Sequence, residues 1–152
     1  MMGDIKMLIA IIGENCAGKS TLANQIKEKR GAAIYSGKDY LRLEKSPALA
    51  MAKFRKLLQD SLTGEDIIYI ITEKEHIGLL PEGAFRIVLT AELETIKSRF
   101  KERMRGNLPV PVERMLETRH GMYDTLACDL KLDGHYRMED VIAALEMGKR
   151  LR

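Results

Sequence analysis

The sequence IIGENCAGKST, residues 11–21, decides the fold of this chain of 152 residues. Residues 13–20 carry glycines five positions apart, followed by lysine and serine, and so satisfy the pattern G-x-x-x-x-G-K-[ST]. The apolar run at residues 5–12 predicts a strand buried on both faces, and residues 19–30 predict a helix that Gly31 ends. Strand, glycine-rich loop and helix in this order predict an anion-binding loop at a helix N-terminus.

The residue types in this loop fit a polyphosphate. Glycines let the backbone curl so that consecutive N–H groups point inward, and the helix N-terminus adds partial positive charge. Lys19 can then bridge the β- and γ-phosphates of ATP, while the Ser20 hydroxyl can bind Mg²⁺. We therefore expect ATP and Mg²⁺ as cofactors. The loop residues expected to contact the nucleotide are Gly13, Asn15, Cys16, Ala17, Gly18, Lys19, Ser20 and Thr21.

Strands and helices alternate along the rest of the chain. Short apolar runs bounded by turn residues predict four more strands, at residues 32–35, 66–72, 85–90 and 129–133. Apolar residues at helical spacing predict further helices at residues 46–64, 92–104, 112–126 and 138–150. In the first of these, Leu49, Phe54, Leu57 and Leu58 are expected in the core. The order predicts an α/β sandwich with a five-stranded, mostly parallel sheet.

Composition and length limit the class of protein. Hydrophobic residues make up 45% and charged residues 31% of the chain, which is typical of one folded domain. The N-terminal apolar run is much shorter than the roughly 20 residues of a membrane-spanning helix, so we expect a cytoplasmic protein with no membrane partner. The two cysteines, Cys16 and Cys128, lack the CxxC spacing of a zinc site and do not indicate a disulfide framework.

Positive charge gathers late in the chain, although the net charge is only +3. The cations of this segment are Lys97, Arg99, Lys101, Arg103, Arg105, Arg114 and Arg119. Arg99 and Arg103 are one helical turn apart and precede an irregular loop at residues 106–111. Arginines delivered by a closing loop neutralise the charge on a phosphoryl group in transfer. A solvated helix face paired with Glu102 is the alternative.

The chain lacks the Asn-Lys-x-Asp sequence with which G proteins read guanine, and it lacks a transporter signature such as LSGGQ. It resembles the nucleoside-monophosphate-kinase-like family of small P-loop kinases, which includes adenylate, cytidylate, shikimate and gluconate kinases. The resemblance implies a three-layer P-loop NTPase sandwich. It also implies an ATP-dependent phosphotransferase acting on a nucleotide or small metabolite, with residues 1–152 as one domain and a short lid around residues 103–111.

Three segments carry this resemblance beyond the P-loop (residues 13–20). YSGKDYLR, residues 35–42, resembles the family's acceptor segment and implies that Asp39 orients or deprotonates the acceptor hydroxyl and that Arg42 binds an anion. VLTAELETIKSRFKERMRG is similar to the strand and helix that lead to the lid, and implies nucleotide contact by Arg99 and a catalytic role for Arg103. ETRHGMYDTLACDLKLDG is similar to the segment after the lid, particularly in shikimate kinases, and implies acceptor binding by Arg119.

Several of these residues have structural alternatives. Glu73 follows an apolar strand, where P-loop enzymes place the acid that holds Mg²⁺ through water, but its charged surroundings are typical of an exposed loop. Asp39 can instead cap a short helix. Arg42 can instead form a surface ion pair with Glu44 or Glu28.

The acceptor stays open because the chain departs from each family pattern. Residues 72–76 replace the Gly-Gly-Gly segment of shikimate kinases, and the full lid and the Asp-Gly-Phe-Pro-Arg segment of adenylate kinases are missing. KDYLR also resembles the acceptor segment of polynucleotide kinases, so a nucleic-acid 5′-end kinase is one alternative, although an aromatic content of 5% offers few stacking platforms. A non-catalytic nucleotide-binding regulatory module is the other. The sequence carries no signal for an oligomeric state.

Overall fold

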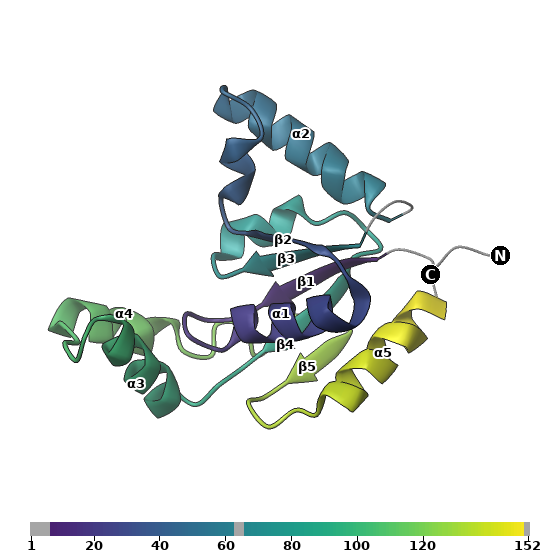
Figure 1. Cartoon of the computed structure of the whole chain (residues 1–152). Helices are drawn as coiled ribbons and strands as arrows, with labels where there is room; N and C mark the ends of the chain where they lie inside the picture. Colours follow the sequence, from purple (N-terminus) through teal and green to yellow (C-terminus); the bar gives the residue numbers. More distant parts are fainter. Residues whose placement is uncertain (1–6, 63–65, 151–152) are drawn as a thin grey trace.

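The computed structural model describes residues 7–62 and 66–150. Its five strands form one sheet in the order β2-β3-β1-β4-β5, and all four neighbouring pairs are parallel. The strands are β1 (Leu8–Ile12), β2 (Ala33–Ser36), β3 (Ile67–Ile71), β4 (Phe85–Leu89) and β5 (Leu130–Leu132). Because the strands are parallel, their carboxyl ends share one edge of the sheet, on the left in Figure 1.

Helices cover both faces of the sheet. They are α1 (Lys19–Arg30), α2 (Pro47–Asp60), α3 (Leu93–Arg103), α4 (Val110–Arg119) and α5 (Met138–Arg150), with short 3-10 helices η1 (Asp39–Arg42) and η2 (Lys74–Leu79). Buried residues of α1 and α5 pack on one face, including Leu22, Ile26 and Leu145. Phe54 and Leu58 of α2 pack on the other. The predicted three-layer α/β sandwich is therefore confirmed. Within the described ranges no helix is long and apolar enough to cross a membrane.

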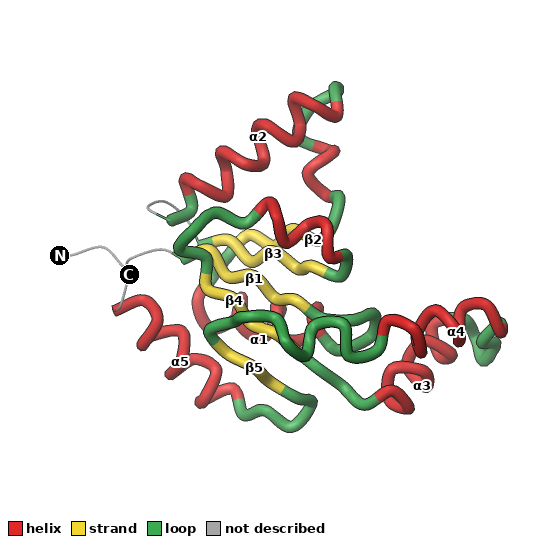
Figure 2. The backbone as a smooth tube through the Cα atoms, turned by 180° about the vertical axis from the view of Figure 1, so that it is seen from behind, coloured by secondary structure: helices red, strands yellow, loops and turns green. Residues whose placement is uncertain are grey.

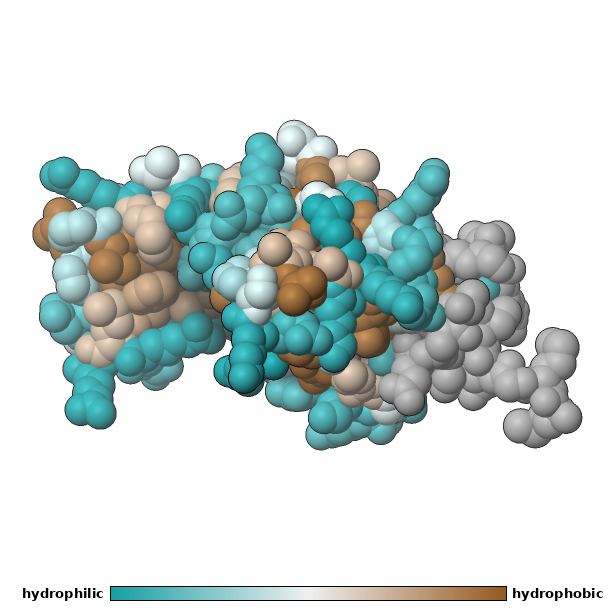
Figure 3. Space-filling view, turned by 90° about the horizontal axis from the view of Figure 1, so that it is seen from above, coloured by the Kyte–Doolittle hydropathy of each residue, from teal (hydrophilic) through white to brown (hydrophobic). Residues whose placement is uncertain are grey.

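Helices α3 and α4 form a hairpin (residues 93–119) that stands away from the sheet at its carboxyl edge (Figure 2). The hairpin has a small apolar core of its own, in which Ile96 and Leu116 are buried together with Cys16 of the P-loop. Seen from above, its hydrophobic surface lies apart from that over α2 (Figure 3). The P-loop is thus the point at which this hairpin joins the main core.

The predicted helices and strands are present, with differences at their ends. Helix α4 begins at Val110 rather than at residue 112, because Pro111 fits the first turn of a helix, where no N–H partner is lost. It ends at Arg119 rather than at residue 126, and Gly121 takes a φ of 83°. Leu49 is 61% exposed, so its predicted place in the core is wrong. The helix predicted at residues 46–64 ends at Asp60, so its predicted end at Gly64 is wrong, and Gly64 itself lies outside the described residues.

The P-loop lies against β4 at Gly13. A Cβ at Gly13 would come within 2.6 Å of the Leu89 carbonyl oxygen, which is backbone and cannot move aside cheaply. The Gly13 amide also donates to the Ile71 carbonyl of β3, at 3.1 Å. Gly13 is therefore wedged between the two neighbours of β1, and this contact fixes where the P-loop leaves the sheet.

Gly13→Ala is expected to lower the free energy of unfolding by about 1–3 kcal/mol, because the added methyl group overpacks the contact with Leu89. Gly78→Ala is the matched control: neither glycine has a positive φ, and a Cβ at Gly78 meets nothing within 4 Å. We expect the control to change stability by less than about 0.5 kcal/mol in the same urea titration. Equal effects of the two substitutions would show that the close approach at Gly13 carries no cost.

Candidate active site

The P-loop has the backbone of an anion cradle. Cys16 and Gly18 take φ values of 60° and 101°, both in the left-handed region. Alternation with right-handed residues turns successive amides toward one side, which is the geometry of a backbone nest. The first hydrogen bond of α1 runs from the Leu22 amide to the Gly18 carbonyl, at 3.1 Å, so the helix N-terminus opens directly onto the loop.

Lys19 is buried, with 6% of its surface exposed, and its Nζ donates to the Glu14 carbonyl oxygen at 2.6 Å. Burial, helped by the charge of Arg103, lowers the pKa of Lys19 to about 8, although Cys16, Glu14 and Glu73 act in the opposite direction. A cation that has lost its water in this way gains strongly from an arriving anion. Lys19 is therefore placed as a receptor for negative charge.

A cavity of roughly 190 Å³ opens at the P-loop and brings together most of the residues predicted to bind ATP. It is lined by Asn15, Cys16, Gly18, Lys19, Ser20, Thr21, Ser36, Ile70, Thr72 and Arg103. The lining thus includes a lysine, an arginine and four hydroxyl-bearing residues around one space beside a helix N-terminus. This combination is suited to the oxygens of a polyphosphate.

A second cavity, of roughly 290 Å³, lies beside the first and shares Arg103 and Thr21 with it. Arg99, Gly134 and Tyr136 lie on its far side. Arg99 also donates through Nη1 to the Cys16 carbonyl at 2.9 Å, which ties α3 to the P-loop. The two arginines of α3 therefore take different places: Arg103 lines both cavities, and Arg99 lines only the second.

A third and larger hollow, of roughly 470 Å³, lies on the other side of Arg99. It is bounded by the segments after β4 and β5 and by His120 and Asp124. The three spaces follow the carboxyl edge of the sheet, which is where ligands bind in open parallel sheets.

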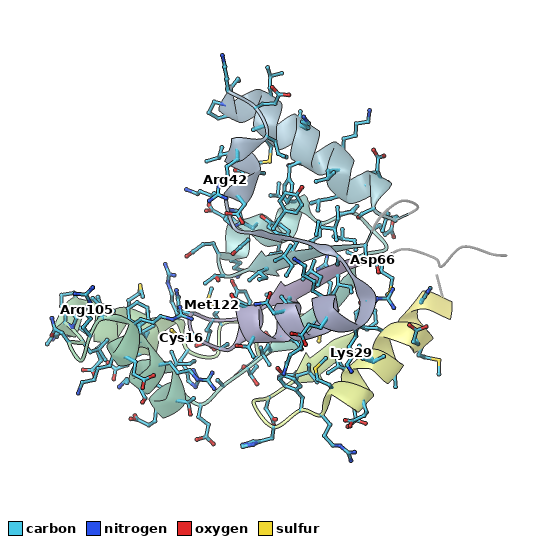
Figure 4. All side chains as sticks on the ribbon, in the orientation of Figure 1. Cys16, Lys29, Arg42, Asp66, Arg105 and Met122 are labelled. Carbon is cyan, nitrogen blue, oxygen red and sulfur yellow. The ribbon has the colours of Figure 1, made fainter. Side chains whose placement is uncertain are left out.

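Asp39 lies at the first turn of η1 and is half-buried, and its Oδ2 accepts a hydrogen bond from the Ser36 amide at 2.9 Å. Ser36 itself lines the P-loop cavity, so Asp39 is one short segment away from it. Arg42 is exposed on η1 and lines neither of the two cavities at the P-loop. Figure 4 shows it at the carboxyl edge, the same side of the molecule as the hairpin. Its predicted alternative partners, Glu44 and Glu28, do not pair with it among the described residues.

Glu73 and Arg119, predicted for the metal and for the acceptor, form an ion pair at 3.2 Å. Both side chains are about two-fifths exposed, at 44% and 39%. Glu73 also acts electrostatically on Lys19. The structure therefore brings these two residues together, with Glu73 close enough to Lys19 of the P-loop to act on its charge.

Sequence reasoning missed Glu14 and the residues it contacts. The carboxylate of Glu14 accepts from the Gly121 amide at 3.0 Å and lies 3.1 Å from His120 Nδ1. Close by, Tyr123 donates to the Thr72 carbonyl at 2.6 Å. Two features of the sequence could have indicated this contact: Glu14 is an acid inside an anion-binding loop, and Gly121 is a glycine soon after α4.

The residues at the P-loop fit a magnesium ion bound mainly through phosphate oxygens. Ser20 is exposed to the cavity that holds Lys19. In the part of the chain that the structure describes, no three or more His, Cys, Asp or Glu side chains group as a metal cage. Mg²⁺ at a nucleotide site needs no such cage, because phosphates and water supply most of its ligands.

Neither a protein-family profile nor a curated protein sequence matches the chain. Solved structures do match it. A gluconokinase from Sinorhizobium meliloti is 12% identical with a TM-score of 0.61, and the alignment covers 97% of this chain and 94% of that one. The YorR protein from Bacillus subtilis, in complex with phosphorylated GDP, is 19% identical with a TM-score of 0.57, covering 93% and 96%.

A shikimate kinase from Aquifex aeolicus is 17% identical with a TM-score of 0.51, and the alignment covers 93% of this chain and 94% of that one. Each of these alignments extends over nearly the full length of both proteins. The chain therefore shares the fold of these solved structures, which include a gluconokinase and a shikimate kinase.

Proposed function

We propose that the protein is an ATP- and Mg²⁺-dependent kinase that phosphorylates a small metabolite or a nucleotide. The observation that carries the proposal is the convergence of Lys19, Ser20 and Arg103 on one cavity at the P-loop. Structural similarity to a gluconokinase and a shikimate kinase supports a small-molecule acceptor. Similarity to a protein bound to phosphorylated GDP supports nucleotide binding at this fold.

In the proposed reaction, the P-loop amides and Lys19 hold the β- and γ-phosphates of ATP. Ser20 and the phosphates would hold Mg²⁺, with Glu73 acting through water, and the ion would supply positive charge to the phosphate oxygens. The cavity shared by Arg99, Gly134 and Tyr136 takes the remainder of the nucleotide. Lys19, whose pKa is lowered by burial, is fully protonated once the phosphates lie against it.

The acceptor lies between η1 and the end of α4 in this proposal. Its hydroxyl oxygen bonds to the γ-phosphorus, the bond from that phosphorus to the β,γ-bridging oxygen breaks, and the hydroxyl proton passes to Asp39. Asp39 can do this because the Ser36 amide occupies only its Oδ2. Arg103 faces the phosphoryl group in transfer, and Arg42 and Arg119 bind anionic groups of the acceptor.

The hairpin is proposed to act as a lid, with its tip at residues 103–111. Closure brings Arg103 against the phosphoryl group and excludes water, so that ATP is not hydrolysed before the acceptor binds. The lid includes all of α3 and α4, because the two helices share one apolar core and would move together. The lid is thus a helical unit rather than a loop alone.

Transfer from γ-labelled ATP to a panel of hydroxy acids, sugars, nucleosides, nucleotides and oligonucleotide 5′ ends tests the proposal. We expect label to move to one class of small acceptor, and Lys19→Ala to lower that rate on the order of 10²- to 10³-fold. Lys27→Ala, an exposed lysine of the same helix, is the control and should transfer at the wild-type rate. Transfer only to oligonucleotides would favour a 5′-end kinase, and ATP binding without any transfer a regulatory module.

Asp39→Asn is expected to lower kcat on the order of 10²-fold or more, because an amide cannot take the hydroxyl proton. ATP affinity and thermal stability should stay near wild-type values, since the Asn oxygen can still accept from the Ser36 amide. Asp39→Ala removes that bond and should cost stability as well, about 0.5–1.5 kcal/mol. The predicted alternative, a cap for a short helix, is not what the structure shows, because η1 begins at Asp39 with Lys38 as its N-cap residue and has no side-chain cap bond. Normal kcat in the Asn variant would leave Asp39 with only its bond to the Ser36 amide, which holds the turn before η1.

Arg103→Ala is expected to reduce kcat on the order of 10²-fold while weakening ATP binding much less, because its charge matters most in the transition state. Lys101→Ala, an exposed cation on the same helix that lines neither P-loop cavity, is the control and should leave both quantities unchanged. Steady-state kinetics and calorimetric titration separate the two effects. If the two variants behave alike, the cations of α3 are a solvated helix face.

A further inference from the structure

Glu14 is an unusual residue for the interior of an anion-binding loop. It is buried, with 7% of its surface exposed, and it does not line the P-loop cavity. A buried carboxylate costs free energy unless it is fully hydrogen-bonded, and its negative charge opposes the binding of phosphate. Its presence therefore calls for contacts that balance this cost.

Both carboxylate oxygens of Glu14 are used outside the loop. Oε2 accepts from the Gly121 amide at 3.0 Å, and Oε1 accepts from His120 Nδ1 at 3.1 Å. These two residues directly follow Arg119, the last residue of α4. The Glu14 side chain thus holds the end of α4 against the P-loop, where the helix stops and the chain turns.

The other helix of the hairpin is held two residues further along the same loop. The Cys16 carbonyl accepts from Arg99 of α3 at 2.9 Å, and the Cys16 side chain is packed with Ile96 and Leu116. Figure 4 shows Cys16 at the root of the hairpin and Arg105 at its tip. Both legs of the hairpin are therefore attached to residues 14–16, one through a backbone oxygen and one through a carboxylate.

The backbone of Glu14 also contacts the residue that receives the donor phosphates. Its carbonyl oxygen accepts from Lys19 Nζ at 2.6 Å. A phosphate that binds Lys19 would compete with this carbonyl oxygen for the same ammonium. One residue thus contacts the phosphate receptor through its main chain and the end of α4 through its side chain.

We propose that Glu14 is a positioning residue that holds the end of α4, and with it Arg119, against the P-loop. Binding of phosphate in the P-loop would then change the position of Arg119 on the acceptor side of the site. The effect on acceptor binding rests on the proposed function. The attachment itself needs no nucleotide and can be measured without one.

The test compares wild type with Glu14→Ala, Glu14→Gln and Glu117→Gln by NMR. Glu117 is the matched control, because it is an acid of α4 that pairs with Lys97 of α3 at 2.9 Å and does not touch the P-loop. We expect the Gly121 amide to exchange with solvent about tenfold faster in Glu14→Ala, since its acceptor is gone. The glutamine variant keeps an oxygen for that amide and should lie near wild type, as should Glu117→Gln.

The second arm adds ADP and Mg²⁺ to the same four proteins. In wild type the Gly121 amide signal should shift when ADP binds the P-loop. In Glu14→Ala this shift should be lost, while the ADP affinity measured by calorimetry should stay within about threefold of wild type. With the acceptor found by the transfer screen, Glu14→Ala should raise the acceptor KM about tenfold and leave the ATP KM within about twofold. Glu14→Gln should have an acceptor KM close to that of wild type.

Unchanged Gly121 exchange and an unchanged ADP response in folded Glu14→Ala would overturn the inference. If Glu14→Ala does not fold, Glu14→Gln decides. Wild-type Gly121 exchange and a wild-type ADP response in Glu14→Gln support attachment of α4 through hydrogen bonding. Fast exchange and no ADP response show that the attachment requires the negative charge of Glu14. A glutamine variant with fast exchange but a wild-type ADP response would overturn the inference. A wild-type protein that fails to bind ADP would contradict the proposed function, while the exchange comparison would still decide whether Glu14 holds the end of α4.

Discussion

The contact between Gly13 and the Leu89 carbonyl is the constraint on which the rest of the site depends. Strand β1 lies in the middle of the sheet, buried along its whole length, and it ends where a side chain has no room. The chain must therefore turn sharply, and the left-handed residues Cys16 and Gly18 carry that turn into α1. A buried lysine, a helix N-terminus and inward amides follow from this one geometric requirement.

Three of the cations at the site have an oxygen of the protein as a partner. Lys19 donates to the Glu14 carbonyl, Arg99 to the Cys16 carbonyl and Arg119 to Glu73. Substrate oxygens would exchange with these oxygens rather than meet bare charges. Such exchange keeps the desolvation cost of the cations low, and it links ligand binding to movement of the P-loop and the hairpin.

The sequence was sufficient for the local features and insufficient for the long-range ones. The P-loop could be predicted because its strand, glycines, lysine and helix are neighbours in the chain, and the alternation of apolar runs predicted the order of the layers. The contact of Glu14 with Gly121 joins residues 107 positions apart, so no local pattern indicated it. The same contact lies at the point where α4 ends before residue 126, which helical spacing alone did not predict. Leu49 shows the converse, since helical spacing of an apolar residue does not ensure that a partner covers it.

A crystal structure with Mg²⁺ and a non-hydrolysable ATP analogue would show whether residues 13–20 bind the triphosphate. We expect Lys19 Nζ to leave the Glu14 carbonyl and to contact oxygens of the β- and γ-phosphates, with the metal at Ser20 and Arg103 turned toward the γ-phosphate. This expectation would be contradicted by a triphosphate bound away from residues 13–20, or by one bound there with Lys19 still hydrogen-bonded to Glu14.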